Sequence, residues 1–138
     1  MPNDALPEGY QPSEDEEYMN PRQLAYFRNK LLHWREALLS ESEETIRNLR
    51  EEDWREPDEN DRATHEEEAA LELRTRDRYR KLISKIDAAL KRIETGEYGY
   101  CEETGAPIGI KRLEARPIAT LTIEAQEQHE RHEAHFST

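Results

Sequence analysis

The sequence predicts a mainly α-helical protein: a long antiparallel coiled-coil hairpin, a small globule and a C-terminal helix. Two long stretches carry apolar residues at alternating spacings of three and four, which is typical of a coiled-coil seam. A proline-containing acidic break, centred on Pro57, separates them. Only 34% of the 138 residues are apolar while 38% are charged, so the chain suits a narrow seam better than a large core.

Composition also limits the classes of function. Twenty Lys and Arg against 32 Asp and Glu give a net charge of −12, which repels DNA phosphates and anionic membranes. We therefore expect neither direct DNA binding nor membrane binding. No apolar run approaches the roughly 20 residues that span a bilayer, no signal peptide is apparent, and the single cysteine offers no disulfide framework. A cytoplasmic protein is expected.

Four segments are predicted. Residues 1–19 are rich in acids and prolines and are expected to form a flexible lead-in. Residues 20–95 form the hairpin, with its tip near 54–63. Residues 96–121 form the globule, and residues 122–138 form the C-terminal helix.

The first helix has a well-marked start. Asn20 can cap it, Pro21 fits the first helical position, and Gln23 stands where a capping box places its amide. The seam is predicted to contain Leu24, Phe27, Leu31, Trp34, Leu38, Ile46 and Leu49.

The second helix follows the break. Pro57 ends the first helix, and Asp58 or Asn60 can cap the second, which Gly96 ends. Because a short turn joins two stretches of similar length, they must run antiparallel. Small residues weaken the seam near the tip. The predicted seam of the second helix is Leu73, Arg76, Tyr79, Leu82 or Ile83, Ile86, Leu90 and Ile93.

The globule differs in pattern. Residues 98–110 place turn residues between short β-like runs, and residues 118–123 form a second β-like run. Its predicted core is Tyr98, Tyr100, Ile108, Ile110, Leu113, Leu121 and Ile123.

The acidic tip suits insertion into a channel of a larger partner, because an exposed tip offers no pocket that excludes water. A simpler interpretation is also available: Asp58 caps a helix and Asp61 suits its dipole. The two roles are compatible. An acid–base pair is disfavoured, since both carboxylates would be solvated with nothing to separate their pKa values. We predict no enzyme.

Three segments carry a resemblance to a known family. They are the Cys101-x-x-Thr104-Gly105 knuckle, the block at 108–117 (IGIKRLEARP) and the run at 71–78 (LELRTRDR). Together they resemble the DksA/TraR family, bacterial transcription factors that bind RNA polymerase through its secondary channel. The likeness extends over about residues 17–126.

This resemblance implies roles for individual residues. The family's acidic tip motif falls on Asp58, Asp61 and Ala63, which would act near the catalytic centre of the polymerase and destabilise promoter open complexes. An arginine that docks on the channel rim falls on Arg78. The alternative for the basic run that contains Arg78 is a solvated face that balances the acids of the first helix.

The resemblance also implies a nucleotide. Residues of the family's guanosine tetraphosphate (ppGpp) site, at the polymerase interface, fall on Leu82, Lys85 and Arg116. A further family lysine falls on Gln126, which removes one phosphate partner.

The largest departure concerns metal. The family knuckle usually has four cysteines, at the positions of Cys101, Thr104, Thr122 and Ala125, and one remains here. Threonine and alanine are not zinc ligands. The chain thus resembles the low-cysteine, zinc-independent branch, and we expect a metal-free, zinc-ribbon-like globule and no zinc. Two less favoured alternatives are a reactive Cys101 thiol and a metal held by Cys101 with His129 and His132.

The predicted function is a monomeric transcription regulator that binds RNA polymerase through the secondary channel, together with ppGpp. The alternative is a coiled-coil adapter or scaffold that does not act at a catalytic centre. A third possibility, a transcript-cleaving relative of the Gre factors, is disfavoured by the resemblance in the globule.

Overall fold

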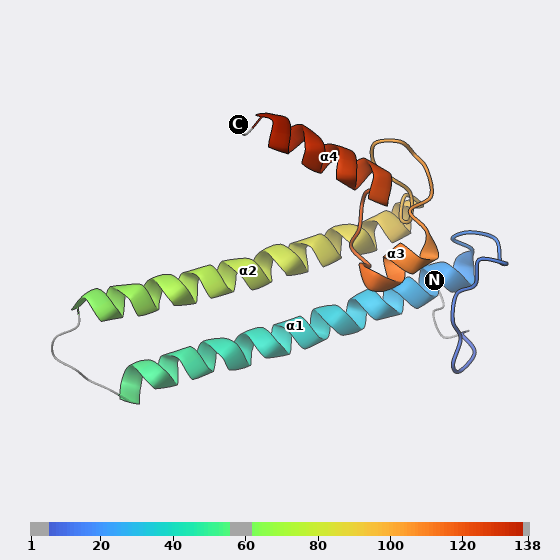
Figure 1. Ribbon diagram of the computed structural model, residues 1–138. Coiled ribbons are helices and arrows are strands. Elements are labelled where there is room, and N and C mark those ends of the chain that lie inside the picture. The colour runs from blue at the N-terminus through green and yellow to red at the C-terminus, as the bar shows by residue number, and fades with distance from the viewer. Residues whose placement is uncertain (1–5, 56–61, 137–138) are drawn as a thin grey trace. The chain divides into compact units, whose positions relative to one another are not determined.

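The computed structural model describes residues 6–55 and 62–136, with side chains described for 6–51 and 64–135. Four helices follow in order: α1 (Pro21–Arg55), α2 (Arg62–Thr95), α3 (Ile110–Ala115) and α4 (Ile123–Phe136) (Figure 1). In the described part of the chain no strand forms, and an isolated bridge joins Tyr100 to Pro107. The predicted mainly α-helical class with a long hairpin is confirmed.

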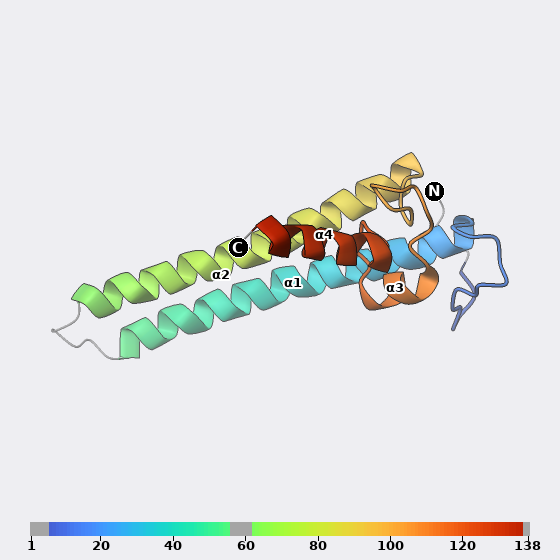
Figure 2. The ribbon, with the colours of Figure 1, turned by 45° about the horizontal axis from the view of Figure 1, so that its top comes forward.

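The chain divides into two compact units. The hairpin unit is Leu32–Asp87, and the terminal unit combines the chain up to Leu31 with the chain from Ala88 onward. Within the hairpin unit, α1 and α2 lie side by side and antiparallel in both views (Figures 1 and 2). In the described ranges, no helix is both long enough and apolar enough to cross a membrane.

The start of α1 forms as predicted. The Asn20 side-chain oxygen accepts hydrogen bonds from the backbone N–H groups of Arg22 and Gln23, at 2.9 and 3.1 Å. The Gln23 side-chain oxygen accepts the N–H of Met19 at 2.7 Å, one residue before the cap. These bonds satisfy donors that the first turn would otherwise leave unpaired. Gln23 is fully buried, so the cap is also part of the packing of the terminal unit.

The seam of the hairpin unit is mostly as predicted. Leu38 and Ile46 of α1 are buried, as are Tyr79 and Ile86 of α2. Leu73, however, is 67% exposed, and the buried residue at this level of α2 is Thr75. Two residues correspond to about 200° around a helix. Once Thr75 and Tyr79 face α1, Leu73 must therefore point away, and its predicted place in the seam is wrong. Arg76, also predicted there, is exposed.

Polar contacts supplement this narrow seam. The hydroxyls of Thr45 and Tyr79 lie 3.4 Å apart and share a hydrogen bond. Arg35 pairs with Asp87 across the helices, with 2.7 Å between guanidinium Nε and carboxylate. The two side chains are 36% and 51% exposed to solvent, so the pair contributes little to stability.

The core of the terminal unit is built around Tyr98. Its ring packs against Phe27 with 5.7 Å between centroids, and its buried hydroxyl donates to the carbonyl of Pro117 at 2.8 Å. Burial raises the pKa of the Tyr98 hydroxyl well above its ordinary value. Tyr98, Ile108, Ile110 and Leu113 are buried, as predicted.

Other predictions for the globule are wrong. Tyr100 is 38% exposed and Ile123 is 51% exposed, and Leu121 is half-buried. Residues 118–123 form turns and the start of α4 rather than a strand. Residues 110–115, for which no helix was predicted, form α3. Short apolar runs of this kind do not distinguish a strand from a single helical turn.

The segment that precedes α1 is fastened to the knuckle. The Tyr18 hydroxyl donates to the carbonyl of Gly99 at 2.7 Å and accepts the N–H of Gly109 at 2.9 Å. Gly99 has a φ of 93°, and a Cβ added there would lie 2.8 Å from Met19. Glycine at 99 thus allows both the backbone conformation and the close approach.

Candidate functional site

The predicted tip lies mostly outside the described residues. Asp58 and Asp61 belong to the stretch between α1 and α2 that the structure does not describe, and Ala63 lies in the first turn of α2 with its side chain outside the described set. The structure does establish the two helix ends, at Arg55 and Arg62. The roles assigned to the tip stay predictions.

Arg78 lies on an exposed face of α2. Its guanidinium carbon is 5.5 Å from the ring centre of Tyr79, which is itself buried against α1. Such a cation–π contact restricts the positions of the guanidinium and leaves its positive charge intact. The role of Arg78 on the channel rim stays a prediction.

The predicted nucleotide residues lie in both units. Leu82 is half-buried and Lys85 is exposed, and their spacing of three places them on one face of α2 in the hairpin unit. Arg116 is exposed in the terminal unit, directly after α3, and its backbone N–H donates to the carbonyl of Arg112 at 2.7 Å. Gln126 lies in α4, where its amide donates to Glu130 at 3.2 Å.

The knuckle positions come together in the terminal unit. Cys101 is buried, and the Thr122 hydroxyl lies 3.9 Å from its sulfur. Thr122 is also buried, and its hydroxyl accepts the N–H of Ala125 at 3.2 Å, while the Thr104 hydroxyl accepts that of Ala106 at 3.2 Å. Cys101 thus lies beside Thr122, whose hydroxyl caps the start of α4.

The Cys101 thiol has an unusual electrostatic environment. Burial alone would raise its pKa. The hydrogen bond with the Thr104 hydroxyl and those with the backbone at Thr122, Thr104 and Glu103 outweigh burial and lower the pKa to about 6. These donors stabilise the thiolate because they point at the sulfur.

Some contacts at the site were not predicted. His129 pairs with the carboxylate of Glu103, which ties α4 to the knuckle and raises the pKa of the imidazole. Within the described ranges, no three His, Cys, Asp or Glu side chains gather so as to hold a metal ion. The alternative metal site of Cys101 with His129 and His132 is therefore not formed.

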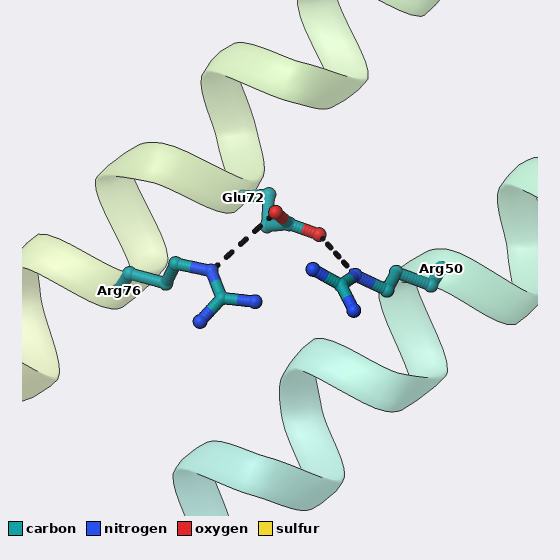
Figure 3. A network of polar contacts seen from close by, with 3 residues as sticks. All are labelled: Arg50, Glu72 and Arg76. Carbon is teal, nitrogen blue, oxygen red and sulfur yellow. Dashed lines mark hydrogen bonds and ion pairs between the residues drawn. The ribbon is translucent and has the colours of Figure 1, made fainter.

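A second unpredicted contact lies in the hairpin unit. Glu72 of α2 accepts from Arg50 of α1 at 3.0 Å and from Arg76, one turn further along α2, at 3.4 Å (Figure 3). These bonds hold the pKa of the Glu72 carboxyl below its usual value. In the sequence, the signal for this contact is the presence of opposite charges on the two predicted helices. Which of these charges pair depends on the register of the two helices, and the sequence pattern does not specify it.

Comparisons with known proteins agree on one family. Residues 23–93 match the family described as DnaK suppressor protein DksA, N-terminal domain, and residues 96–131 match the prokaryotic dksA/traR C4-type zinc finger. The RNA polymerase-binding transcription factor DksA of Caulobacter vibrioides is 64% identical over 90% of this chain and 87% of that protein. Its counterpart in Escherichia coli K12 is 51% identical over 86% and 79%.

A solved structure agrees with these matches. Transcription factor DksA2 from Pseudomonas aeruginosa is 44% identical, with a TM-score of 0.77 over 90% of this chain and 94% of that one.

The zinc-finger match corrects one prediction. We expected no zinc and a metal-free globule, and this expectation is wrong, because the segment matches a C4-type zinc finger, which points to zinc binding. Of the four knuckle positions, Cys101 supplies a thiol, while Thr104 and Thr122 supply hydroxyls and Ala125 supplies no ligand atom. This set differs from four cysteines.

Proposed function

Because the chain belongs to the DksA family, whose matched relatives are RNA polymerase-binding transcription factors, we propose that it regulates transcription by binding RNA polymerase through the secondary channel. The observation that carries this proposal is the coincidence of two family matches, at 23–93 and 96–131, with an antiparallel helical hairpin. Arg78 would dock on the channel rim.

The proposed action is positional rather than chemical. Asp58, Asp61 and Ala63 at the end of the hairpin would stand near the catalytic centre and destabilise promoter open complexes. A factor of this kind shifts an equilibrium only as far as it binds one initiation state better than another. The protein would not be an enzyme, and with a net charge of −12 it would reach the promoter through the polymerase rather than by binding DNA.

The nucleotide ppGpp is the proposed co-regulator. Leu82, Lys85 and Arg116 would form this chain's share of a ppGpp site at the polymerase interface. Lys85 and Arg116 are exposed, and cationic side chains suit phosphates. Gln126 would contribute hydrogen bonds but no charge. We further propose that the protein acts as a monomer in the cytoplasm, where the polymerase works.

The decisive experiment measures binding to RNA polymerase core, in competition with a known secondary-channel ligand. We expect competition. Binding without competition would instead favour the adapter function. Addition to a stalled elongation complex should give no 3′ cleavage of the transcript, and cleavage would indicate a Gre-like activity.

The tip is tested by Asp61→Asn. This change removes one charge and keeps the shape of the side chain. We expect polymerase binding within about twofold of the unchanged protein, and loss of most of the effect on open-complex lifetime, on the order of tenfold or more. Glu66→Gln, which removes the charge of an exposed acid further along α2 and likewise keeps the side-chain shape, is the matched control. An Asp61→Asn protein with full effect would contradict the assigned role.

A further inference from the structure

One part of the hairpin unit has almost no apolar seam. It comprises residues 47–55 of α1 and 62–74 of α2, and we call it the distal hairpin. None of its described side chains is buried, and its Leu73 is 67% exposed. The buried residues that border it are Ile46 of α1 and Thr75 of α2. Burial of apolar surface therefore does little to hold these two helix ends together.

Helical propensity does not make up for the missing seam. Without tertiary packing, helices shorter than about 12–15 residues are marginal in water, and most helical stability in proteins comes from a packed apolar face. The α1 segment of the distal hairpin is shorter than this limit, and the α2 segment is about as long. The distal hairpin therefore depends on other contacts between its helices.

The Glu72 carboxylate supplies such a contact (Figure 3). It accepts from Arg50 of α1 at 3.0 Å and from Arg76 of α2 at 3.4 Å. The Glu72 side chain is 25% exposed, against 51% for Asp87 in its pair with Arg35. Because Arg76 already restrains Glu72 from the next turn of α2, Glu72 has less rotamer freedom to lose when it pairs with Arg50. Networks of this kind are more effective than isolated surface pairs.

The same contact carries the register of the helices into the distal hairpin. Fifteen residues separate Arg35 from Arg50 along α1, and fifteen separate Glu72 from Asp87 along α2. The two cross-helix ion pairs thus share one antiparallel register over about 22 Å of helix. A slip of α1 against α2 by one turn would separate the partners of both pairs by about 5 Å. The Arg50–Glu72 pair therefore opposes such a slip in a stretch where apolar side chains do not specify the register.

We propose that Glu72 is a positioning residue: its contact with Arg50 keeps the ends of α1 and α2 side by side and in register, and the effect of Asp58 and Asp61 on open complexes depends on this contact. The inference rests on the proposed function, because those acids matter only if they act at the polymerase. It requires no contact of Glu72 or Arg50 with the polymerase itself.

The test reverses the two charges. Arg50→Glu places two carboxylates opposite each other, and Glu72→Arg gathers three guanidinium groups. The double variant Arg50→Glu/Glu72→Arg restores an opposite pair between the helices and the original net charge. We expect each single variant to lose at least about fivefold of the effect on open-complex lifetime while its affinity for RNA polymerase core stays within about threefold. The double variant should regain most of the lost effect.

The matched control is Glu67→Arg. It makes the same charge change as Glu72→Arg at an exposed position of α2. Its effect on open-complex lifetime should stay within about twofold of the original, because exposed charges without a structured partner contribute little.

Hydrogen exchange of the free protein measures the positioning without the polymerase. Backbone amides at 47–51 and 64–74 should exchange at least about threefold faster in each single variant and return toward the original rates in the double variant. Amides around Ile86, a fully buried residue of the seam, should be unchanged in all variants, which shows that the rest of the hairpin stays folded.

The outcomes separate this proposal from the proposed function. Unchanged exchange rates, or full open-complex effects in both single variants, would overturn the role of Glu72 alone. Losses in the single variants without recovery in the double variant would also overturn it, since Arg50 and Glu72 would then act separately. If the original protein itself had no effect on open complexes, the proposed function would fall, and this proposal with it.

Discussion

Single residues decide how the terminal unit closes. The Tyr18 hydroxyl joins the carbonyl of Gly99 to the N–H of Gly109, two backbone groups ten residues apart in the knuckle. Met19, with a left-handed φ of 55°, packs directly on Gly99. The approach is possible because residue 99 has no Cβ. The Tyr18 hydroxyl thus fastens the end of the segment before α1 to the knuckle, and glycine at position 99 leaves room for Met19.

This arrangement is tested by Gly99→Ala. The added Cβ would lie 2.8 Å from Met19 Cγ and Sδ, in a backbone conformation that L residues rarely adopt. Gly105→Ala is the matched control, since Gly105 also has a positive φ but no atom within 4 Å of the added Cβ. Denaturant unfolding should show Gly99→Ala to be less stable than Gly105→Ala by about 1–3 kcal/mol. Equal losses would mean that conformation alone matters.

At the scale of elements, the register of α1 against α2 sets the character of the hairpin unit. With Thr75 and Tyr79 facing α1, Leu73 is turned outward and Glu72 lies within reach of Arg50. The seam at this level contains the polar Thr75 and the hydroxyl pair of Thr45 and Tyr79. It therefore buries less apolar surface than the seam around Ile86, further along α2. The ion pair of Arg50 with Glu72 therefore lies where the seam is least apolar.

The Glu72 contacts predict a dependence on acid. Hydrogen bonding to Arg50, and then to Arg76, lowers the folded-state pKa of Glu72 below its usual 4.5. The Glu72 contacts therefore contribute fully to the free energy of unfolding above about pH 4.5. This contribution is lost as the pH falls through the lower folded-state pKa of Glu72. Glu72→Gln should make unfolding of the protein less sensitive to acid in this range.

The control for that experiment is Glu67→Gln. Glu67 is exposed on α2 and forms no ion pair in the described ranges, so its replacement should leave the acid dependence unchanged. The measurement is the denaturant midpoint as a function of pH. Identical pH profiles for Glu72→Gln and the original protein would show that the contacts of Glu72 with Arg50 and Arg76 are too exposed to contribute to stability.

At the scale of the whole molecule, charge is distributed unevenly. The chain carries −12 overall, yet Arg47, Arg74 and Arg78 of the hairpin unit and Arg116 of the terminal unit are exposed. A protein of this kind repels nucleic acid in general while it presents local cationic surfaces to chosen anions. The proposed partners, RNA polymerase and a polyphosphorylated nucleotide, fit that distribution.

The nucleotide assignment is tested by Arg116→Ala. The guanidinium has no partner in the part of the chain that the structure describes, and the one contact of Arg116 to α3 uses its backbone N–H, which alanine keeps. We therefore expect the fold and the nucleotide-free effect on transcription to persist, and the additional effect of ppGpp to fall at least several-fold. Lys111→Ala, on the exposed side of α3, is the matched control. Equal loss with and without ppGpp would refute the assignment.

By itself the sequence determined the features that local rules govern. Asn20, Pro21 and Gln23 specify the start of α1, the spacing of Phe27, Leu31, Leu38 and Ile46 specifies a seam, and Tyr98 and Leu113 are buried as predicted. The motifs of residues 71–78 and 101–117 also sufficed to indicate the family that the comparisons then established. The expectation of no zinc went beyond the family match and was corrected by it.

Only the tertiary structure decided what depends on contacts between distant residues. The outward turn of Leu73 and the Arg50–Glu72–Arg76 contacts both follow from the register of two helices, which no local pattern specifies. The Tyr18 link to Gly99 joins residues 81 positions apart. Short segments such as 110–115 become helical or extended according to the surface on which they pack, because their own propensity is too weak to decide.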